Sequence, residues 1–215
     1  MDSLRGTLPS CCACVARPIG NDEEFDPSEA PHLRHAVLGR RAEFAAGRSA
    51  AKEALQMLGV RTRTIPAGAD RSPIWPSGTI GSITHARGWA LAVAASTRDI
   101  QGIGIDLEHC ASVEPHLWPQ VLQTDEMHRL QRMPHADQTR WATATFCAKE
   151  AFFKMQWPTT KTWIDFAEVD VVLSASGNRF SLTVRHPLAP PTLVRREFAG
   201  IFVRIGHLIS ALMWI

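Results

Sequence analysis

Apolar residues recur at helical spacing in two long segments of the chain. In residues 36–58, small apolar side chains repeat every four positions, which places them on one face of a helix. These residues are Ala42, Ala46, Ala50, Ala54 and Leu58. Residues 137–156 predict the clearest helix, because its apolar stripe repeats at steps of four and three. That stripe consists of Trp141, Thr145, Ala148, Phe152 and Met155. We expect Gly59 to stop the first helix and Pro158 to end the second.

Shorter apolar runs between turn residues predict strands. These runs are residues 81–85, 89–95, 101–108, 169–173, 180–184, 201–205 and 208–214. Ser-Gly-Asn at 176–178 favours a hairpin between two of the later runs. Frequent Pro and Gly predict irregular structure over residues 1–30 and 62–78. Thr124, followed by two acidic residues, is the expected cap of a short helix that Pro134 breaks.

Each half of the chain thus runs from a helix into strands. We therefore predict an α/β (α+β) fold built from two similar halves, which we divide into residues 1–104 and 105–215. With 215 residues, the chain is long enough for one large domain or two small ones. The pattern alone does not prove a duplication, because the two halves share little sequence identity.

The composition restricts the broad class of protein. Hydrophobic residues make up 45% and charged residues 20%, which is typical of a soluble globular protein. The formal net charge of +2 does not indicate nucleic-acid binding. Apolar runs stay shorter than the roughly 18 residues that a membrane span needs, and the N-terminus lacks the apolar core of a signal peptide. We expect a cytoplasmic protein whose five cysteines are free thiols.

Asp106 and Glu108 form the first acidic pair. On a strand their side chains project from the same face, because alternate residues do so. Neighbouring carboxylates raise each other's pKa unless a cation lies between them, and carboxylate oxygens are ligands that Mg²⁺ accepts. A solvated strand end explains the pair equally well, so the pair alone is a weak indication of a metal site.

Glu150 and Lys154 lie four residues apart on the second helix, with Lys149 in the same turn. A surface ion pair worth about 0.2–0.5 kcal/mol is the simplest interpretation. The surrounding residues are apolar, however, and burying charges without a function is unfavourable. A binding or catalytic role for this turn is the alternative.

Two features of the first half suit a phosphate. Arg40 and Arg48 lie on one ridge of the first helix with Phe44 between them, and a guanidinium matches phosphate geometry. Thr84 and His85 end an apolar strand beside a glycine. A solvated helix face and a structural histidine are the simpler interpretations. The glycine-rich fingerprints of nucleotide-binding folds do not occur in the chain.

Taken in order, several segments resemble the Sfp-type 4′-phosphopantetheinyl transferases, and most closely the branch of enterobactin synthetase component D. The segments are 40–48, 73–76, 81–85 (Gly-Ser-Ile-Thr-His), 104–108 (Gly-Ile-Asp-Leu-Glu) and 146–154 (Phe-Cys-Ala-Lys-Glu-Ala-Phe-Phe-Lys). Each motif alone is common, whereas five in this order are specific. The resemblance covers residues 40–154 and extends more weakly to the C-terminus.

The resemblance implies a reaction and a fold. A serine hydroxyl of an apo acyl or peptidyl carrier protein attacks the β-phosphate of coenzyme A, and 3′,5′-ADP leaves. The cofactor is Mg²⁺, with Mn²⁺ as an alternative. The family implies a monomer whose two halves form a pseudo-dimer, with the active site in the cleft between them. Coenzyme A contacts are expected from the first half, and the metal and catalytic helix from the second.

The resemblance also implies roles for particular residues. Asp106, Glu108 and Glu150 match the metal-binding acids, and Lys154 matches a lysine near the phosphates. Glu126 aligns with a proposed base for the carrier serine. The residues assigned to coenzyme A are Arg40, Arg48, Arg71, Thr84, His85, Asp106, Lys149 and Lys154. Arg71 lies beside a phosphate-binding lysine position of the family rather than on it.

Two departures from the family pattern are mild. Thr84 stands where serine is usual and keeps the hydroxyl, and Cys147 replaces a serine of similar size. Two other functions stay open: a different Mg²⁺-dependent enzyme that cleaves phosphoanhydrides, and an inactive module that binds carrier proteins. The pathway of the carrier protein also stays open among siderophore or nonribosomal peptide, polyketide and fatty-acid synthesis.

Overall fold

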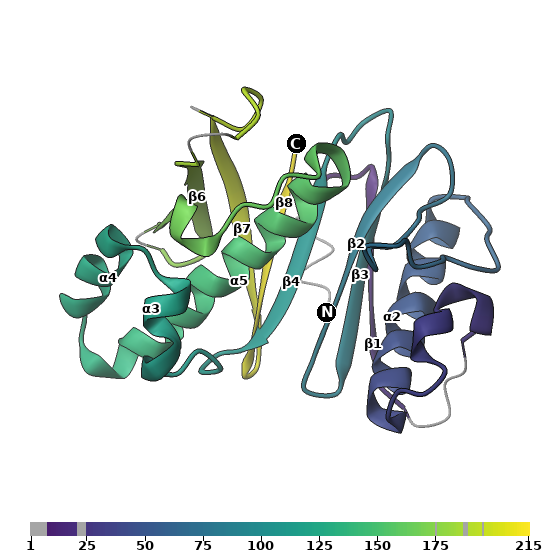
Figure 1. Ribbon diagram of the computed structural model, residues 1–215, viewed down its shortest axis with the longest axis horizontal. Helices are drawn as coiled ribbons and strands as arrows, with labels where there is room; N and C mark the ends of the chain where they lie inside the picture. The colour runs from purple at the N-terminus through teal and green to yellow at the C-terminus, as the bar shows by residue number, and fades with distance from the viewer. Residues whose placement is uncertain (1–7, 21–24, 175, 187–188, 195) are drawn as a thin grey trace. The chain divides into compact units, whose positions relative to one another are not determined.

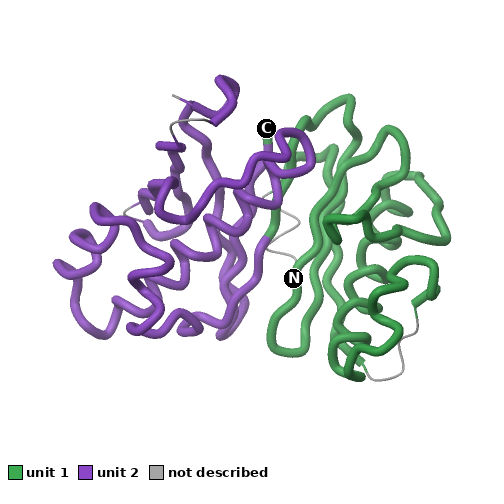
Figure 2. The backbone as a smooth tube through the Cα atoms, in the orientation of Figure 1, with its two compact units in different colours: residues 1–105, 215 green, residues 106–214 purple. Residues whose placement is uncertain are grey.

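The structure is a computed structural model that describes residues 8–20, 25–174, 176–186, 189–194 and 196–215 (Figure 1). The chain forms two compact units (Figure 2): unit 1 comprises residues 1–105 and residue 215, and unit 2 comprises residues 106–214. The boundary falls inside strand β4 (Ile103–His109), one residue beyond the predicted division. Each unit contains a β-sheet and helices, which confirms the predicted α/β class.

Unit 1 is a three-stranded antiparallel sheet packed against one long helix (Figure 1). The strands are β1 (Cys12–Pro18), β2 (Thr79–Ala86) and β3 (Trp89–Ser96), with β3 in the centre. Helix α2 (Leu38–Met57) forms within the predicted helical segment and packs its alanine face on this sheet. The contact is close, because a Cβ on Gly47 would lie 2.9 Å from Ile83 Cγ2.

Strand β1 corrects the prediction that residues 1–30 are irregular, while residues 1–7 and 21–24 lie outside the described residues. β1 pairs with β3 from Cys12 opposite Ala95 to Pro18 opposite Trp89. Val15 is its one β-branched residue and it has no aromatic residue, so the strand has few of the side chains that indicate strands from sequence. Its stability comes from β3 and α2 rather than from local propensity.

Short 3-10 turns and a long connection complete unit 1. The turns are Pro27–Glu29 and Pro31–Leu33. Glu29 is fully buried, accepts a hydrogen bond from Ile65 N–H at 2.6 Å, and forms an ion pair with Lys52 at 3.0 Å. This buried carboxylate ties the start of the chain to the connection between α2 and β2, which contains an isolated bridge between Ala67 and Pro73.

Unit 2 contains a sheet in the order β4-β8-β7-β6-β5, with the longest helix lying along it (Figure 1). The strands after β4 are β5 (Val169–Leu173), β6 (Arg179–Val184), β7 (Glu197–Ile205) and β8 (Leu208–Trp214). The pairs β5–β6, β6–β7 and β7–β8 are antiparallel, which confirms the predicted C-terminal strands. Helix α5 (His135–Thr160) buries the predicted stripe that begins at Trp141.

Smaller helices surround the start of α5, and two predicted details are wrong. The helices are η3 (Pro115–Leu117), α3 (Trp118–Val121), α4 (Thr124–Gln131) and η4 (Phe166–Glu168). The cap of α4 is Gln123 rather than Thr124, in a capping box with Glu126. α5 also continues past Pro158 to Thr160, where Lys161 N–H bonds to Trp157 O at 3.1 Å and closes the last turn. Among the described residues, none of the helices is both long and apolar enough to cross a membrane.

Candidate active site

Strand β4 holds Asp106 and Glu108 in the positions that the alternation of a strand predicts. Asp106 is buried, and Glu108 is partly exposed at the strand end. Ser210 on the neighbouring strand β8 donates a hydrogen bond to Asp106 O at 2.8 Å. Just before it, Ile105 N–H donates to Ser82 Oγ at 3.1 Å within unit 1. These bonds fix the backbone from which the two carboxylates project.

Lys154 on helix α5 forms an ion pair with Asp106, with Nζ 2.5 Å from Oδ1. Burial alone would lower the pKa of Lys154, but the Asp106 carboxylate and its hydrogen bond raise it above its usual value, with Glu150 contributing. Lys154 therefore stays cationic at neutral pH. The sequence suggested a local pair between Glu150 and Lys154, whereas the ion pair of Lys154 with Asp106 joins the helix to the strand.

Glu108 and Glu150 both have raised pKa values. Burial is the main cause for each, and the negative charge of Asp106 adds to both. Ser112 donates a hydrogen bond to Glu108 at 2.9 Å, which opposes the rise. The three carboxylates lie within electrostatic reach of one another, and a cation among them would relieve their repulsion.

Cys147 lies beneath these acids on α5 and is fully buried. Its thiol lies 3.7 Å from Ile209 O, and burial together with the Asp106 charge raises its pKa well above the usual value. A thiol held in its protonated form is a poor nucleophile. Cys147 is therefore a core residue.

The oxygen donors of this region have the right chemistry for Mg²⁺. Within the described residues, no three His, Cys, Asp or Glu side chains are already gathered as a metal-binding group. Asp106, Glu108 and Glu150 nevertheless supply carboxylates from one strand and one facing helix, and Mg²⁺ binds to a few carboxylates plus water and phosphate oxygens. The donor set thus fits a hard divalent cation.

A pocket of about 630 Å³ opens beside Glu108 and Glu150. Its other walls are largely apolar, and the aromatic part consists of Phe146, Phe153, Trp163 and Phe166. Phe153 packs edge-on against Trp163, with ring centroids 5.2 Å apart, while 67% of the Trp163 surface stays exposed. This wall was not predicted because Trp163 lies in an irregular connection after the helix and Phe166 begins the short η4.

Glu126 and Lys149 form a buried ion pair with a full set of hydrogen bonds. Lys149 Nζ donates to Glu126 Oε2 at 2.6 Å, to Phe166 O at 2.7 Å and to Val121 O at 2.9 Å. Glu126 also accepts the N–H groups of Val171, at 2.8 Å, and Gln123, at 3.0 Å. Burial raises the pKa of Glu126 and lowers that of Lys149, and their mutual attraction opposes both shifts.

In unit 1 the structure brings two of the predicted phosphate contacts together. Arg40 Nη1 on α2 lies 2.8 Å from His85 Nε2 on β2. Glu43, one turn further along α2, lies 3.1 Å from the same Arg40 nitrogen and 3.8 Å from His85 Nε2. Sequence reasoning missed Glu43, although its spacing of three residues from Arg40 indicates a shared helix face.

The other predicted residues of unit 1 lie in different surroundings. Arg48 is 5% exposed, and its guanidinium carbon lies 4.4 Å from the centre of the Phe44 ring. Burial lowers the pKa of Arg48 to about 10, against the attraction of Glu29. Thr84 is buried on β2, whereas Arg71 is exposed in the connection before β2, with a backbone φ of 63°.

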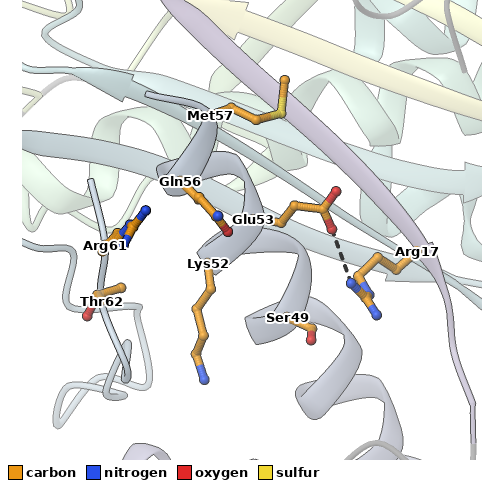
Figure 3. A pocket seen from close by; sticks show the side chains of 8 residues that line it. All are labelled: Arg17, Ser49, Lys52, Glu53, Gln56, Met57, Arg61 and Thr62. Carbon is orange, nitrogen blue, oxygen red and sulfur yellow. Dashed lines mark hydrogen bonds and ion pairs between the residues drawn. The ribbon is translucent and has the colours of Figure 1, made fainter. Parts of the chain in front are cut away.

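A second hollow, of about 940 Å³, lies over the C-terminal half of α2 (Figure 3). Arg17 forms an ion pair with Glu53 at 3.1 Å there, and Lys52 is paired with the buried Glu29. Two of its cations are thus already compensated, and its lining contains none of the predicted site residues.

Comparisons with known proteins agree with the motifs of the two units. Residues 28–95 match the family model of the 4′-phosphopantetheinyl transferase N-terminal domain, and residues 102–197 match that of the 4′-phosphopantetheinyl transferase superfamily. The chain is 36% identical over 146 residues to 4′-phosphopantetheinyl transferase PptT of Mycobacterium tuberculosis, covering 67% of this chain and 63% of that protein.

Two further relatives extend the similarity. The chain is 31% identical over 175 residues to 4′-phosphopantetheinyl transferase Svp of Streptomyces mobaraensis, covering 81% of this chain and 70% of that protein. It is 40% identical over 141 residues to enterobactin synthase component D of Salmonella typhimurium, covering 61% of this chain and 56% of that protein. These relatives include the branch that the sequence motifs predicted.

Proposed function

The chain belongs to the 4′-phosphopantetheinyl transferase superfamily, and we propose that it transfers the phosphopantetheine arm of coenzyme A to a serine of an apo carrier protein. In this reaction the serine oxygen forms a bond to the β-phosphorus of coenzyme A. The bond from that phosphorus to the bridging oxygen breaks, and 3′,5′-ADP leaves. The serine proton is released to the solvent.

The observation that carries the proposal is the set of charges on β4 and α5 within unit 2. Asp106, Glu108 and Glu150 supply oxygen ligands, and the Asp106 carboxylate keeps Lys154 charged at 2.5 Å. We assign the binding of Mg²⁺, or Mn²⁺, to these three acids. The bound ion would act as a Lewis acid and neutralise charge on the pyrophosphate of coenzyme A.

Lys154 is the proposed electrostatic partner of the leaving phosphate. Because its ammonium group is fixed by Asp106 and largely buried, it can stabilise charge that develops near it without reorganisation. The two residues have different roles in this proposal. Asp106 holds the lysine in place, and the lysine faces the negative charge that develops on the leaving phosphate.

The pocket beside Glu108 and Glu150 suits the pantetheine arm of the substrate. Its volume of about 630 Å³ lies in the range of small-molecule sites, and its walls combine apolar rings with the two acids at one end. A flexible, weakly polar arm matches the apolar walls, and a phosphate at its end would meet the two acids through the metal ion that they hold. Phe153 and Trp163 are the proposed aromatic contacts.

Glu126 and Lys149 are better suited to holding the site together than to proton transfer. Both side chains are buried, and the carboxylate of Glu126 already accepts three hydrogen bonds. A base for the carrier serine must reach the proton that it removes. We therefore assign positioning roles to this pair instead of the catalytic and coenzyme A roles that the motif suggested.

In unit 1 we assign contacts with the phosphates and nucleotide of coenzyme A to Arg40, Arg48, Arg71, Thr84 and His85. The approach of Arg40 to His85 at 2.8 Å supports a shared anion site for those two residues. A monomeric state and a cytoplasmic location are part of the same proposal. Similarity to enterobactin synthase component D favours a peptidyl carrier protein as the acceptor.

The release of 3′,5′-ADP tests this function against the alternatives. A transferase releases 3′,5′-ADP from coenzyme A only when an apo carrier protein with an intact serine is present. An enzyme that hydrolyses phosphoanhydrides releases it without the carrier, and an inactive module releases none. A carrier with Ser→Ala at the acceptor position is the matched control, and release that is independent of this serine would contradict the proposal.

A further inference from the structure

Glu43 occupies an unusual position between two residues that we assign to phosphate binding. Its carboxylate lies 3.1 Å from Arg40 Nη1 and 3.8 Å from His85 Nε2, while those two nitrogens lie 2.8 Å apart. All three side chains remain between about a third and a half exposed. A ligand can therefore reach the place where the carboxylate now lies.

The hydrogen bonding defines the state of this group. A guanidinium has only donors, so His85 Nε2 must accept the bond from Arg40. The bond thus uses the lone pair of His85 Nε2. Arg40 carries the positive charge of the trio, and Glu43 supplies the anion that compensates it.

We propose that Glu43 is an internal anion that opposes the binding of a ligand phosphate to Arg40 and His85. The inference rests on the proposed function, because it takes coenzyme A as the ligand. Carboxylate and phosphate compete for the same guanidinium geometry. An incoming phosphate must displace the Glu43 carboxylate and then remain close to its negative charge.

The competition predicts how a substitution of Glu43 changes the affinity for coenzyme A, in direction and in size. Glu43→Gln keeps the shape of the side chain and removes its charge. Two unit charges about 4 Å apart in water interact by about 1 kcal/mol, which corresponds to about fivefold in a dissociation constant. We therefore expect Glu43→Gln to bind coenzyme A about fivefold more tightly, and the gain to shrink at high salt.

Glu53→Gln provides a matched control on the same helix. Glu53 is also a partly exposed glutamate that pairs with an arginine, Arg17, at 3.1 Å, but it faces the second hollow instead of His85. Calorimetric titration of the full chain with coenzyme A would compare wild type, both variants and Arg40→Met. Circular dichroism would verify that each variant is folded.

Tighter binding by Glu43→Gln, with Glu53→Gln unchanged, supports the inference. The same titration with 3′-dephospho-coenzyme A identifies the phosphate: loss of the gain assigns the site to the 3′-phosphate, and an equal gain assigns it to the pyrophosphate. An unchanged or weakened affinity in Glu43→Gln, while Arg40→Met binds more weakly, overturns the role of Glu43 alone. If Arg40→Met leaves the affinity unchanged, the assignment of Arg40 and His85 to the ligand fails as well.

Discussion

The buried pair of Lys149 and Glu126 leads to a prediction about stability. Lys149 is 1% exposed and Glu126 is fully buried, and the lysine joins three segments through Val121 O, Glu126 and Phe166 O. Lys149→Met keeps much of the side-chain volume and removes the charge. The variant leaves a buried carboxylate without its counter-ion and removes the lysine hydrogen bonds to Val121 O and Phe166 O.

The expected loss of stability is large. Breaking a buried ion pair by removing one partner costs about 3–5 kcal/mol, because the remaining charge stays desolvated. For a chain of this size, a loss of that order lowers the melting temperature by about 6–20 °C. Arg140→Met is the comparison on the same helix, since Arg140 forms an exposed pair with Asp137 at 3.7 Å. Exposed pairs of this kind contribute at most about 1 kcal/mol.

The pH dependence identifies Glu126 as the cause. Burial raises the pKa of Glu126 above its ordinary value of 4.5, and Lys149 opposes the rise. Without Lys149 the folded pKa rises further. A carboxyl group whose pKa is raised in the folded state lowers the free energy of unfolding as the pH rises from its unfolded pKa through its folded pKa. The deficit of Lys149→Met should therefore be largest at pH 8 and smaller near pH 5.

Urea unfolding followed by tryptophan fluorescence measures this effect. Five of the seven tryptophans, Trp118, Trp141, Trp157, Trp163 and Trp214, lie in unit 2 and report on the unit that contains the pair. The double variant Glu126→Gln, Lys149→Met should recover part of the loss, because no charge remains buried. A deficit below about 1 kcal/mol at pH 8, or one that grows toward pH 5, would refute the reasoning.

Other predictions concern packing, the pocket and the charge of Lys154. Gly81→Ala should destabilise unit 1 by several kcal/mol, because its Cβ would lie 2.6 Å from Trp75 Cζ2. Gly39→Ala should not, because a Cβ at Gly39 would have nothing within 4 Å. Thermal melts of the two variants test this difference. Trp163→Ala should raise the KM for coenzyme A about tenfold in steady-state assays and change kcat little, since it removes a pocket wall; a selective fall in kcat would contradict this. Lys154→Met should lower kcat about 10²–10³-fold in the same assays with folding retained, and a smaller change would argue against its role at the phosphate.

Periodicity predicted the helices and strands whose apolar repeat lies within one continuous segment of the sequence. The alanine face of α2 and the stripe on α5 are buried on helices as expected, because each repeats at the period of a helix. The alternation of β4 also predicted that Asp106 and Glu108 share a face. Local pattern failed at β1, whose small residues form a strand only because β3 lies beside them.

In the candidate site, too, local sequence predicted some features and missed those that depend on distant contacts. The motifs supplied the candidate residues, but the partners of those residues depend on contacts between distant segments. Lys154 bonds to Asp106, 48 residues away, rather than relying on Glu150 in its own helix. The position of Glu126 at a helix start suggests an accessible acid. In the structure it is buried, paired with Lys149, 23 residues away, and bonded to the cap residue Gln123. Spacing along the chain cannot reveal such pairs.

The intact mass of an apo carrier protein tests the central claim most directly. The carrier is incubated with the full chain, coenzyme A and Mg²⁺. Parallel reactions contain the Glu150→Gln variant or its control Asp137→Asn, which substitutes an exposed acid on the same helix. The account predicts a gain of one phosphopantetheine arm with wild type and Asp137→Asn, and none with Glu150→Gln or with EDTA. No gain on fatty-acid, peptidyl or polyketide carriers, with coenzyme A binding verified, would contradict it.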